Sequence, residues 1–134
     1  MYEQLCNLWF TYELQRRLDF DASGGGDSVK VNAVSPGFIP TTGLTRRSGT
    51  LGVFFLHYIL DPLRYLGMGI TRSPDDGANV IVQTSTSEVA SKGGQYFHLP
   101  KGEDTIVAIP SSDESLDQDK AGKLWEISEK ICKL

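Results

Sequence analysis

The chain has few cysteines, no long hydrophobic run and no surplus of positive charge. Cys6 and Cys132 are the only cysteines among 134 residues. This excludes a zinc knuckle, a C-x-x-C redox motif and a disulfide framework, and it predicts two buried, reduced thiols. The most apolar stretch, residues 51–60, is shorter than the roughly 20 residues that a membrane-spanning helix needs. A formal net charge of −4 argues against nucleic-acid partners and anionic membranes.

The sequence also lacks the common phosphate-binding and nucleophile motifs. Its glycine run at 24–26 follows a predicted helix and precedes a predicted strand, which reverses the order found in a dinucleotide-binding turn. Neither G-x-x-x-x-G-K-[ST] nor G-x-S-x-G occurs. His57 and His98 have no second histidine at helical spacing, so we interpret both as structural residues and expect no metal site.

Helices and strands are predicted to alternate along the chain, in the order typical of a layered α/β protein. Apolar residues at helical spacing predict a helix over 2–18, with Arg16 and Arg17 in its last turn. A glycine-rich loop over 19–27 follows this helix. The β-branched run over 29–34 then predicts a short strand.

Two further helices are predicted in the middle of the chain. Residues 53–66 are strongly apolar and contain Pro62, which we expect to kink the helix. Ser73 supplies an N-cap for the next helix, which begins with a proline and two aspartates and is closed by the glycines at 93–94. Residues 95–99 predict a second strand of the sheet. The capped helix has one predicted apolar face, formed by Ala78, Ile81, Val82, Ser85 and Val89.

The C-terminal segment is more polar than the rest of the chain. Residues 100–114 form a predicted polar linker, within which the apolar run 105–109 is a candidate edge strand. Ser115 to Gln118 fits a capping box for a last helix. The apolar stripe of that helix is predicted to consist of Leu124, Ile127 and Ile131.

Several of these patterns together resemble one known family. The predicted strand reads V-K-V-N-A-V and leads into a loop that matches the pattern P-G-x-[IV]-x-T. The matching residues are Pro36, Gly37, Ile39 and Thr41. With the helix before it, the capped helix after it and the tail at 123–130, this arrangement resembles the C-terminal portion of the short-chain dehydrogenase/reductase family. Within that family it is similar to the branch of retinol-dehydrogenase-like and protochlorophyllide-reductase-like enzymes.

The resemblance spans nearly the whole chain, although residues 42–72 match only in general character. It implies an α/β fold that is the C-terminal part of a Rossmann-type doubly wound parallel sheet, with two or three strands and four helices. On this interpretation residues 1–134 form a single partial domain. The nucleotide-binding half that precedes this portion in the family is then absent.

The resemblance also implies a chemistry, the transfer of a hydride between NADP or NAD and a hydrophobic carbonyl or alcohol. The implied partner is therefore a small hydrophobic substrate. In the family a tyrosine is the general acid/base, and Tyr2 occupies that position here. Phe38 is implied to cover the substrate, together with the apolar helix from residue 53. The cofactor-binding residues implied by the Pro-Gly motif are Pro36, Gly37, Ile39 and Thr41.

The chain departs from the family beside Tyr2. The family has a lysine four residues after its tyrosine, where i and i+4 side chains meet and the ammonium lowers the pKa of the phenol. Cys6 stands at that position, as though Ser-Lys were missing between Gln4 and Leu5. Because a thiol cannot supply a fixed positive charge, we expect the chain to be inactive alone.

Two further hypotheses stay open. One is a non-catalytic remnant that acts as a binding module, pairing with a partner or with a second copy as a homo-oligomer. The other is an incomplete gene model, in which Met1 is an internal start. The sequence fixes neither the substrate, nor the choice between NAD and NADP, nor the compartment, for which the cytoplasm is the default and an organelle is an alternative.

Overall fold

The computed structural model describes residues 2–21, 29–39, 72–100 and 102–133 and the single positions 52, 54 and 58, without the side chains of residues 2 and 3. Within these residues the α/β class is confirmed, with three α-helices and a three-stranded sheet. The predicted helix over 53–66 lies outside the described residues apart from positions 54 and 58. The described elements are α1 (Tyr2–Asp21), β1 (Ala33–Ser35), α4 (Pro74–Thr86), the 3-10 turn η4 (Glu88–Ala90), β2 (Tyr96–His98), β3 (Val107–Ala108), the 3-10 turn η5 (Asp113–Leu116) and α5 (Gln118–Cys132).

The sheet is mixed, with the strand order β1-β2-β3. β1 and β2 are parallel and place Val34 opposite Phe97, whereas β3 runs antiparallel to β2. The strand predicted over 95–99 is confirmed as β2. The candidate edge strand within 105–109 is confirmed as β3, which lies at the edge of the described sheet.

β1 is shorter than predicted and begins later. The pattern predicts a strand over 29–34, but only Ala33–Ser35 form β1. Before it, single backbone hydrogen bonds hold the chain, such as that from the Gly94 N–H to the Val31 carbonyl oxygen at 2.8 Å. A β-branched run indicates extended backbone, but strand pairing also needs a partner, and β2 begins only opposite Ala33.

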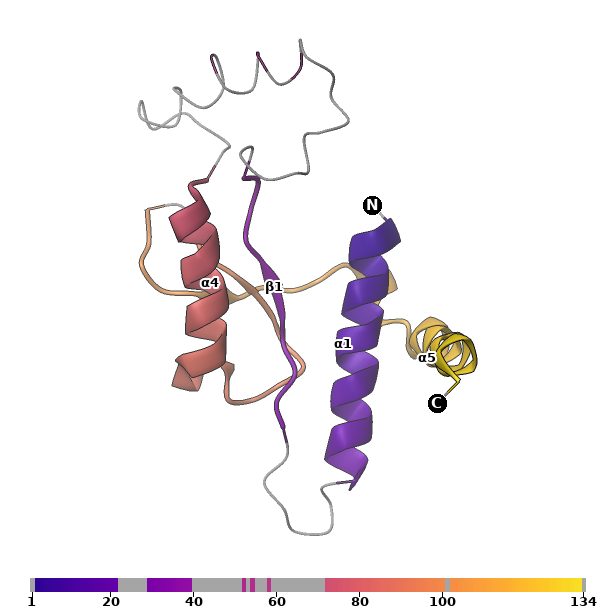
Figure 1. Cartoon of the computed structure of the whole chain (residues 1–134). Coiled ribbons are helices and arrows are strands. Elements are labelled where there is room, and N and C mark those ends of the chain that lie inside the picture. Colours follow the sequence, from indigo (N-terminus) through magenta and orange to yellow (C-terminus); the bar gives the residue numbers. More distant parts are fainter. Residues whose placement is uncertain are drawn as a thin grey trace.

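The sheet lies between two helices. α4 covers one face, α1 covers the other, and α5 packs against α1 on the side away from the sheet (Figure 1). The apolar core lies between α4 and the sheet, and Val34 packs against it from β1. The buried residues of this core are Val80, Ala90, Phe97, Leu99 and Ile106.

α1 is joined to the sheet region through a buried polar side chain. Gln15 is 4% exposed, and its Oε1 accepts a hydrogen bond from the Val31 N–H at 2.6 Å while its Nε2 donates to Asp19 Oδ1 at 2.8 Å. The same side chain fills the space that a Cβ at Gly93 would need, and Gly93 has a φ of +70°, which favours glycine. Gln15 thus joins the middle of α1 to the segments that precede β1 and β2.

α1 is also longer than predicted. It continues to Asp21, so the predicted loop over 19–27 is wrong in its first residues, which are helical. Glu13 forms ion pairs at 2.7 Å with both Arg16 and Arg17. Such contacts between residues three and four apart support the turns that follow. The two arginines therefore lie before the last turn and not in it.

The predicted N-terminus of α4 is confirmed. Ser73 Oγ accepts a hydrogen bond from the Asp76 N–H at 3.0 Å, and the Asp76 carboxylate accepts one from the Ser73 N–H at 3.1 Å. The helix ends at Thr86 and is not closed by the glycines at 93–94. It ends there because Ser87 is extended and its hydroxyl caps the separate turn η4.

The residues predicted to form one apolar face of α4 are exposed to solvent. Ile81, Val82 and Val89 are 54%, 57% and 50% exposed. The buried residues of the helix are Gly77 and Val80 instead. Because glycine has no side chain, the helix surface that packs inward carries little apolar signal in the sequence.

α5 begins two residues later than its predicted capping box. Its N-cap is Asp117, whose side chain accepts a hydrogen bond from the Lys120 N–H at 3.0 Å. Ser115, the predicted cap, is buried in η5 and donates to the Ser112 carbonyl oxygen at 2.6 Å. Its hydroxyl therefore serves the preceding turn and is not available to α5.

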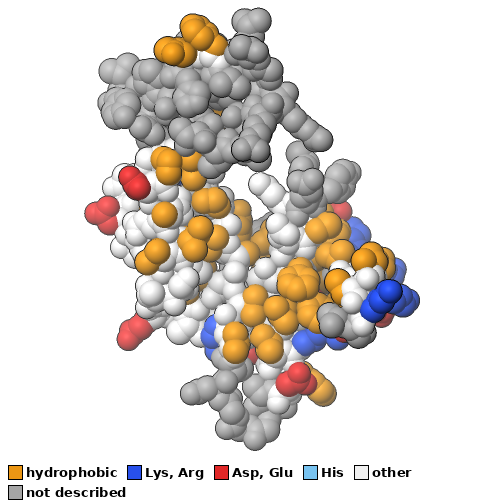
Figure 2. Space-filling view, viewed as in Figure 1, with side chains coloured by type: hydrophobic (Ala, Val, Ile, Leu, Met, Phe, Trp, Pro, Cys, Tyr) orange, Lys and Arg blue, Asp and Glu red, His pale blue; other side chains and the backbone are white. Residues whose placement is uncertain are grey.

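α5 packs on α1 through an aromatic pair, and of its predicted stripe only Leu124 is half-buried. Trp125 stacks on Phe10 with ring centroids 5.2 Å apart, and the Arg17 guanidinium lies 4.7 Å from the centroid of the Trp125 ring. Ile127 and Ile131 of the stripe are 54% and 74% exposed. Hydrophobic side chains consequently gather on the surface over α4 and around the α1–α5 pair (Figure 2).

The two cysteines are free, and the expectation that both are buried is wrong. Cys6 is half-buried in α1, whereas Cys132, the last residue of α5, is exposed. Cys132 is exposed because it lies at the C-terminal end of α5, where residues 130–133 are all exposed.

Candidate functional site

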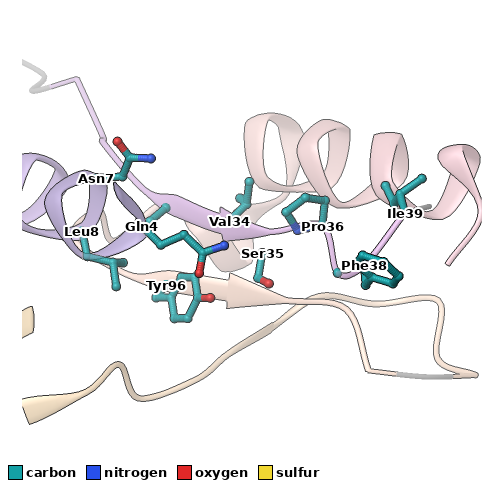
Figure 3. A pocket seen from close by; sticks show the side chains of 11 residues that line it. Gln4, Asn7, Leu8, Val34, Ser35, Pro36, Phe38, Ile39 and Tyr96 are labelled. Atoms are coloured by element: carbon teal, nitrogen blue, oxygen red, sulfur yellow. The ribbon is translucent and has the colours of Figure 1, made fainter. Parts of the chain in front are cut away.

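A cavity of about 590 Å³ lies where α1 begins and β1 ends. Its volume is in the range of small-molecule binding sites. Ligands of open α/β sheets bind beyond the carboxyl ends of the parallel strands, and the cavity extends past the end of β1. Figure 3 shows the eleven lining residues, which are Gln4, Asn7, Leu8, Ala33, Val34, Ser35, Pro36, Gly37, Phe38, Ile39 and Tyr96.

The first turns of α1 and one face of the strands form the two walls. Gln4 and Asn7 stand three positions apart, so the same helix face presents both amides to the cavity. On β1, Val34 turns toward α4 and Ser35 turns to the opposite side (Figure 3). Tyr96 pairs with the residue two before Ser35, which places it on the same side of the sheet.

The described lining of the cavity is uncharged. No acidic or basic side chain is among the described residues that line it. Its polar groups are amides and hydroxyls, which both donate and accept hydrogen bonds. Apolar side chains stand beside them, so the lining suits an uncharged ligand with a carboxamide, carbonyl or alcohol group and an apolar body.

The Pro-Gly loop, defined here as residues 36–39, closes one end of the cavity. Gly37 has a φ of +80°, a conformation that favours glycine. Ile39 and Pro36 lie against Gly77 of α4, where a Cβ would collide with the Ile39 side chain. The missing side chain at position 77 therefore lets α4 approach the loop and support it.

Arg72 also contacts the Pro-Gly loop, at Phe38 and Gly37. Its N–H donates to the Phe38 carbonyl oxygen at 2.8 Å. Its aliphatic stem covers Gly37, since a Cβ there would lie 2.5 Å from Arg72 Cδ. The guanidinium donates to the Leu99 carbonyl oxygen and lies 3.5 Å from His98 Nε2. One side chain thus links the loop to the end of β2.

The structure brings four of the six predicted site residues together. The same cavity is lined by Pro36, Gly37, Phe38 and Ile39. Tyr2 begins α1, whose first turns form a wall of the cavity, but its side chain lies outside the described residues. Thr41 lies outside them entirely. The roles assigned to these residues, cofactor binding, substrate contact and acid–base chemistry, stay predictions.

The residues that complete the site from other elements were missed by the sequence analysis. They are Gln4, Asn7, Ser35, Tyr96 and Arg72. The three-residue spacing of the two α1 amides and the place of Ser35 directly before the Pro-Gly motif were usable signals. The positions of Tyr96 and Arg72 depend on strand pairing and on the path of the chain, and no local pattern marks them.

Charged groups with shifted pKa values lie away from the cavity. At the start of α5, the hydrogen bond from the Lys120 backbone lowers the pKa of Asp117, and the hydrogen bond to Glu114 raises the pKa of Lys120. Within the described ranges, no group of three or more His, Cys, Asp or Glu side chains is arranged to hold a metal ion. None of the helices described is long and apolar enough to cross a membrane.

Comparison with known proteins confirms the resemblance of the chain to the short-chain dehydrogenase/reductase family. Over 128 residues, 94% of the chain, it is 30% identical to retinol dehydrogenase 14 of Homo sapiens. Over 132 residues, 98% of the chain, it is 26% identical to protochlorophyllide reductase A, chloroplastic, of Hordeum vulgare. Over the same number of residues it is 27% identical to protochlorophyllide reductase, chloroplastic, of Marchantia paleacea. No family model matches the chain.

The chain spans only part of these proteins. The matched regions cover 32% of the human protein, 31% of the Hordeum protein and 26% of the Marchantia protein. The chain therefore corresponds to about a third of the length of the first two and about a quarter of the third. All three relatives are oxidoreductases by name, and they belong to the two kinds of enzyme that the motifs indicate.

Proposed function

We propose that the chain is the substrate-side portion of an NAD(P)-dependent oxidoreductase that acts on a hydrophobic carbonyl or alcohol. The observation that carries the proposal is the cavity at the end of β1, which four residues of the Pro-Gly loop line together with the first turns of α1. In this proposal residues 1–134 are part of a Rossmann-type domain, with the β1–β2 pair in its parallel sheet and residues 100–114 connecting the sheet to α5.

The lining fits the nicotinamide end of such a cofactor. A carboxamide has one acceptor and two donors, and Gln4, Asn7 and Ser35 offer complementary groups in the uncharged described lining. No lysine or arginine is among the described lining residues, so in this proposal the described lining contacts the uncharged nicotinamide end. We assign cofactor contact to the four motif residues Pro36, Gly37, Ile39 and Thr41.

A bound nicotinamide cofactor supplies or accepts the hydride, and the residues of the chain orient and shield the reaction. We assign to Phe38 the exclusion of water from an apolar substrate. We assign to Tyr2 the transfer of the proton at the substrate oxygen. Cys6 stands where an ammonium lowers the pKa of the phenol in the family, so we expect no measurable turnover by the chain alone.

Titration of the purified chain with NADPH, followed by the fluorescence of the cofactor, tests this proposal. We expect a saturable change in fluorescence. Ser35→Leu fills the cavity and should weaken binding, whereas Ile81→Ala, on the exposed face of α4, should leave it unchanged. Circular dichroism confirms that each variant is folded. A chain that does not change the fluorescence at any concentration contradicts cofactor binding by this portion alone, and a Ser35→Leu variant that binds like the wild type contradicts binding in the cavity.

A binding module is the second candidate, and one observation favours it. β1 pairs only with β2 in the described sheet, which leaves its other edge available to a further strand. A partner that adds a strand there would cover the cavity and contact α1. Sedimentation of the chain alone distinguishes a self-associating form from a monomer. A folded monomer that binds NADPH would rule out this candidate.

A further inference from the structure

We propose that Arg72 is a positioning residue for the Pro-Gly loop. Arg72 does not line the cavity, yet it contacts the loop and the end of β2 together. It fixes the conformation in which residues 36–39 close the cavity. Its effect on cofactor affinity rests on the proposed function, whereas its effect on the loop does not.

Arg72 makes three contacts, two with the Pro-Gly loop and one with the residue after β2. The hydrogen bond from its N–H at 2.8 Å fixes the direction of the Phe38 carbonyl. Its stem lies against Gly37 and occupies the space that a side chain at position 37 would need. Its guanidinium donates to the Leu99 carbonyl oxygen, directly after β2. Because Leu99 belongs to the buried core, this last contact ties the loop to a rigid part of the molecule.

The same geometry explains why position 37 is glycine on two separate grounds. The φ of +80° disfavours any side chain there, whatever its surroundings. In addition, a Cβ would lie 2.5 Å from Arg72 Cδ and 2.7 Å from Arg72 Nε. The first cost remains when Arg72 is shortened, but the second disappears. Gly37 and Arg72 should therefore show a coupling that a double-mutant cycle can measure.

A loop held in its binding conformation before the ligand arrives binds more tightly, because less conformational freedom is lost on binding. Release of the Arg72 contacts should thus weaken cofactor binding although the lining residues are unchanged. The guanidinium can be separated from the stem by substitution. Arg72→Met keeps an unbranched stem over Gly37 without a donor, and Arg72→Lys keeps both a stem and a donor.

The test compares Arg72→Met and Arg72→Lys in the full chain, with Arg16→Met as the matched control. Arg16 is a half-exposed arginine on α1 that pairs with Glu13, away from the loop. Nuclear magnetic resonance reports the amide resonance of Gly37 and the hydrogen exchange of the residue-72 N–H. We expect exchange about tenfold faster in Arg72→Met, the effect of losing one hydrogen bond of ordinary strength. We expect the NADPH dissociation constant to rise about 3- to 10-fold in the same variant and to return toward the wild-type value in Arg72→Lys.

Each outcome decides the inference. Unchanged Gly37 resonance and unchanged exchange in Arg72→Met overturn it, whether or not the chain binds NADPH. A loosened loop with wild-type affinity also overturns it, since Arg72 is then only structural. A wild-type chain that does not bind NADPH contradicts cofactor binding by this portion alone, and the loop measurements then decide the role of Arg72 by themselves. If Arg72→Met fails to fold, the cycle of Gly37→Ala with Arg72→Ala, which removes the side-chain atoms that a Cβ at position 37 would meet, provides the coupling, and additive effects overturn the inference.

Discussion

Val34 and Ser35 are neighbours on β1, yet they face two differently packed sides of the sheet. Val34 meets the apolar core beneath α4, where Phe97 and Val80 are fully buried. Ser35 faces the side of α1, where a cavity remains and where the buried side chain of Gln15 forms the hydrogen-bonded link. The comparison shows that apolar burial joins the layers on one side, whereas hydrogen bonds join them on the other and leave space for a ligand.

The largest expected effect comes from opening the apolar side. Phe97→Ala removes the ring at the centre of the core and should lower the free energy of unfolding by about 3–5 kcal/mol, measured by urea denaturation. Tyr96→Ala, the adjacent residue on the opposite face, is the matched control and should cost about 1 kcal/mol. Equal losses in the free energy of unfolding for the two variants would show that the two faces of the sheet are packed alike.

Breaking the polar link between α1 and the sheet region should have the next largest effect. Gln15→Leu keeps the size of the side chain but leaves the Val31 N–H without its acceptor, which should cost about 1–3 kcal/mol. Gln118→Leu, at the exposed start of α5, should change stability by less than about 0.5 kcal/mol. Unfolding by urea measures both. If Gln15→Leu is neutral, apolar contact and not the hydrogen bond holds α1 in place.

The N-cap of α4 should contribute less. Ser73→Ala removes the acceptor for the Asp76 N–H and should cost about 0.5–2 kcal/mol. Ser85→Ala is the same change at an exposed position inside the same helix, where it should be neutral or slightly stabilising. Thermal unfolding followed by circular dichroism compares the two. A similar midpoint for both variants would mean that the cap does not limit the stability of α4.

The smallest expected effect is the pH dependence of stability that Asp117 contributes at the start of α5. The backbone hydrogen bond of Lys120 lowers the pKa of Asp117, so its contribution to stability is present above the ordinary aspartate pKa and is lost as the pH falls through the lowered value. Asp117→Asn should reduce the acid-dependent part of the unfolding curve, whereas Asp119→Asn, without the cap contact, should not. An identical pH dependence in wild type and Asp117→Asn would contradict the assignment.

The elements determined by adjacent residues were predictable from sequence. Ser73 and Asp76 cap α4 within one turn, and the strand over 95–99 is bounded by a glycine pair and a proline. The ends of α1 and β1 were less predictable. Side-chain hydrogen bonds extend α1 to Asp21, and the start of β2 limits the length of β1.

The buried faces of the helices could not be predicted because tertiary contacts decide them. α4 packs through Gly77 and Val80, and a glycine adds nothing to an apolar pattern. α5 packs through Trp125 on Phe10, residues on elements far apart in the sequence. Most of the periodic apolar residues of both helices are exposed instead, so periodicity indicated the helices correctly but not the faces that they bury.

The candidate site likewise has one part that local sequence predicts and another that only tertiary packing determines. Its contiguous part, the Pro-Gly loop, could be found because a short motif marks it. Gln4, Asn7 and Tyr96 reach the cavity from α1 and β2, and only the packing of the fold places them there. Arg72 follows the loop by more than thirty positions, and its contact with Gly37 has no counterpart in local sequence.

The hydrogen bond between the Phe38 carbonyl oxygen and the Arg72 N–H joins two parts of the chain that serve different elements. Phe38 follows β1, and Arg72 comes directly before the N-cap of α4. A change at either partner should therefore reach both the Pro-Gly loop and the start of α4. Stability measured at one of these places then reports on the other.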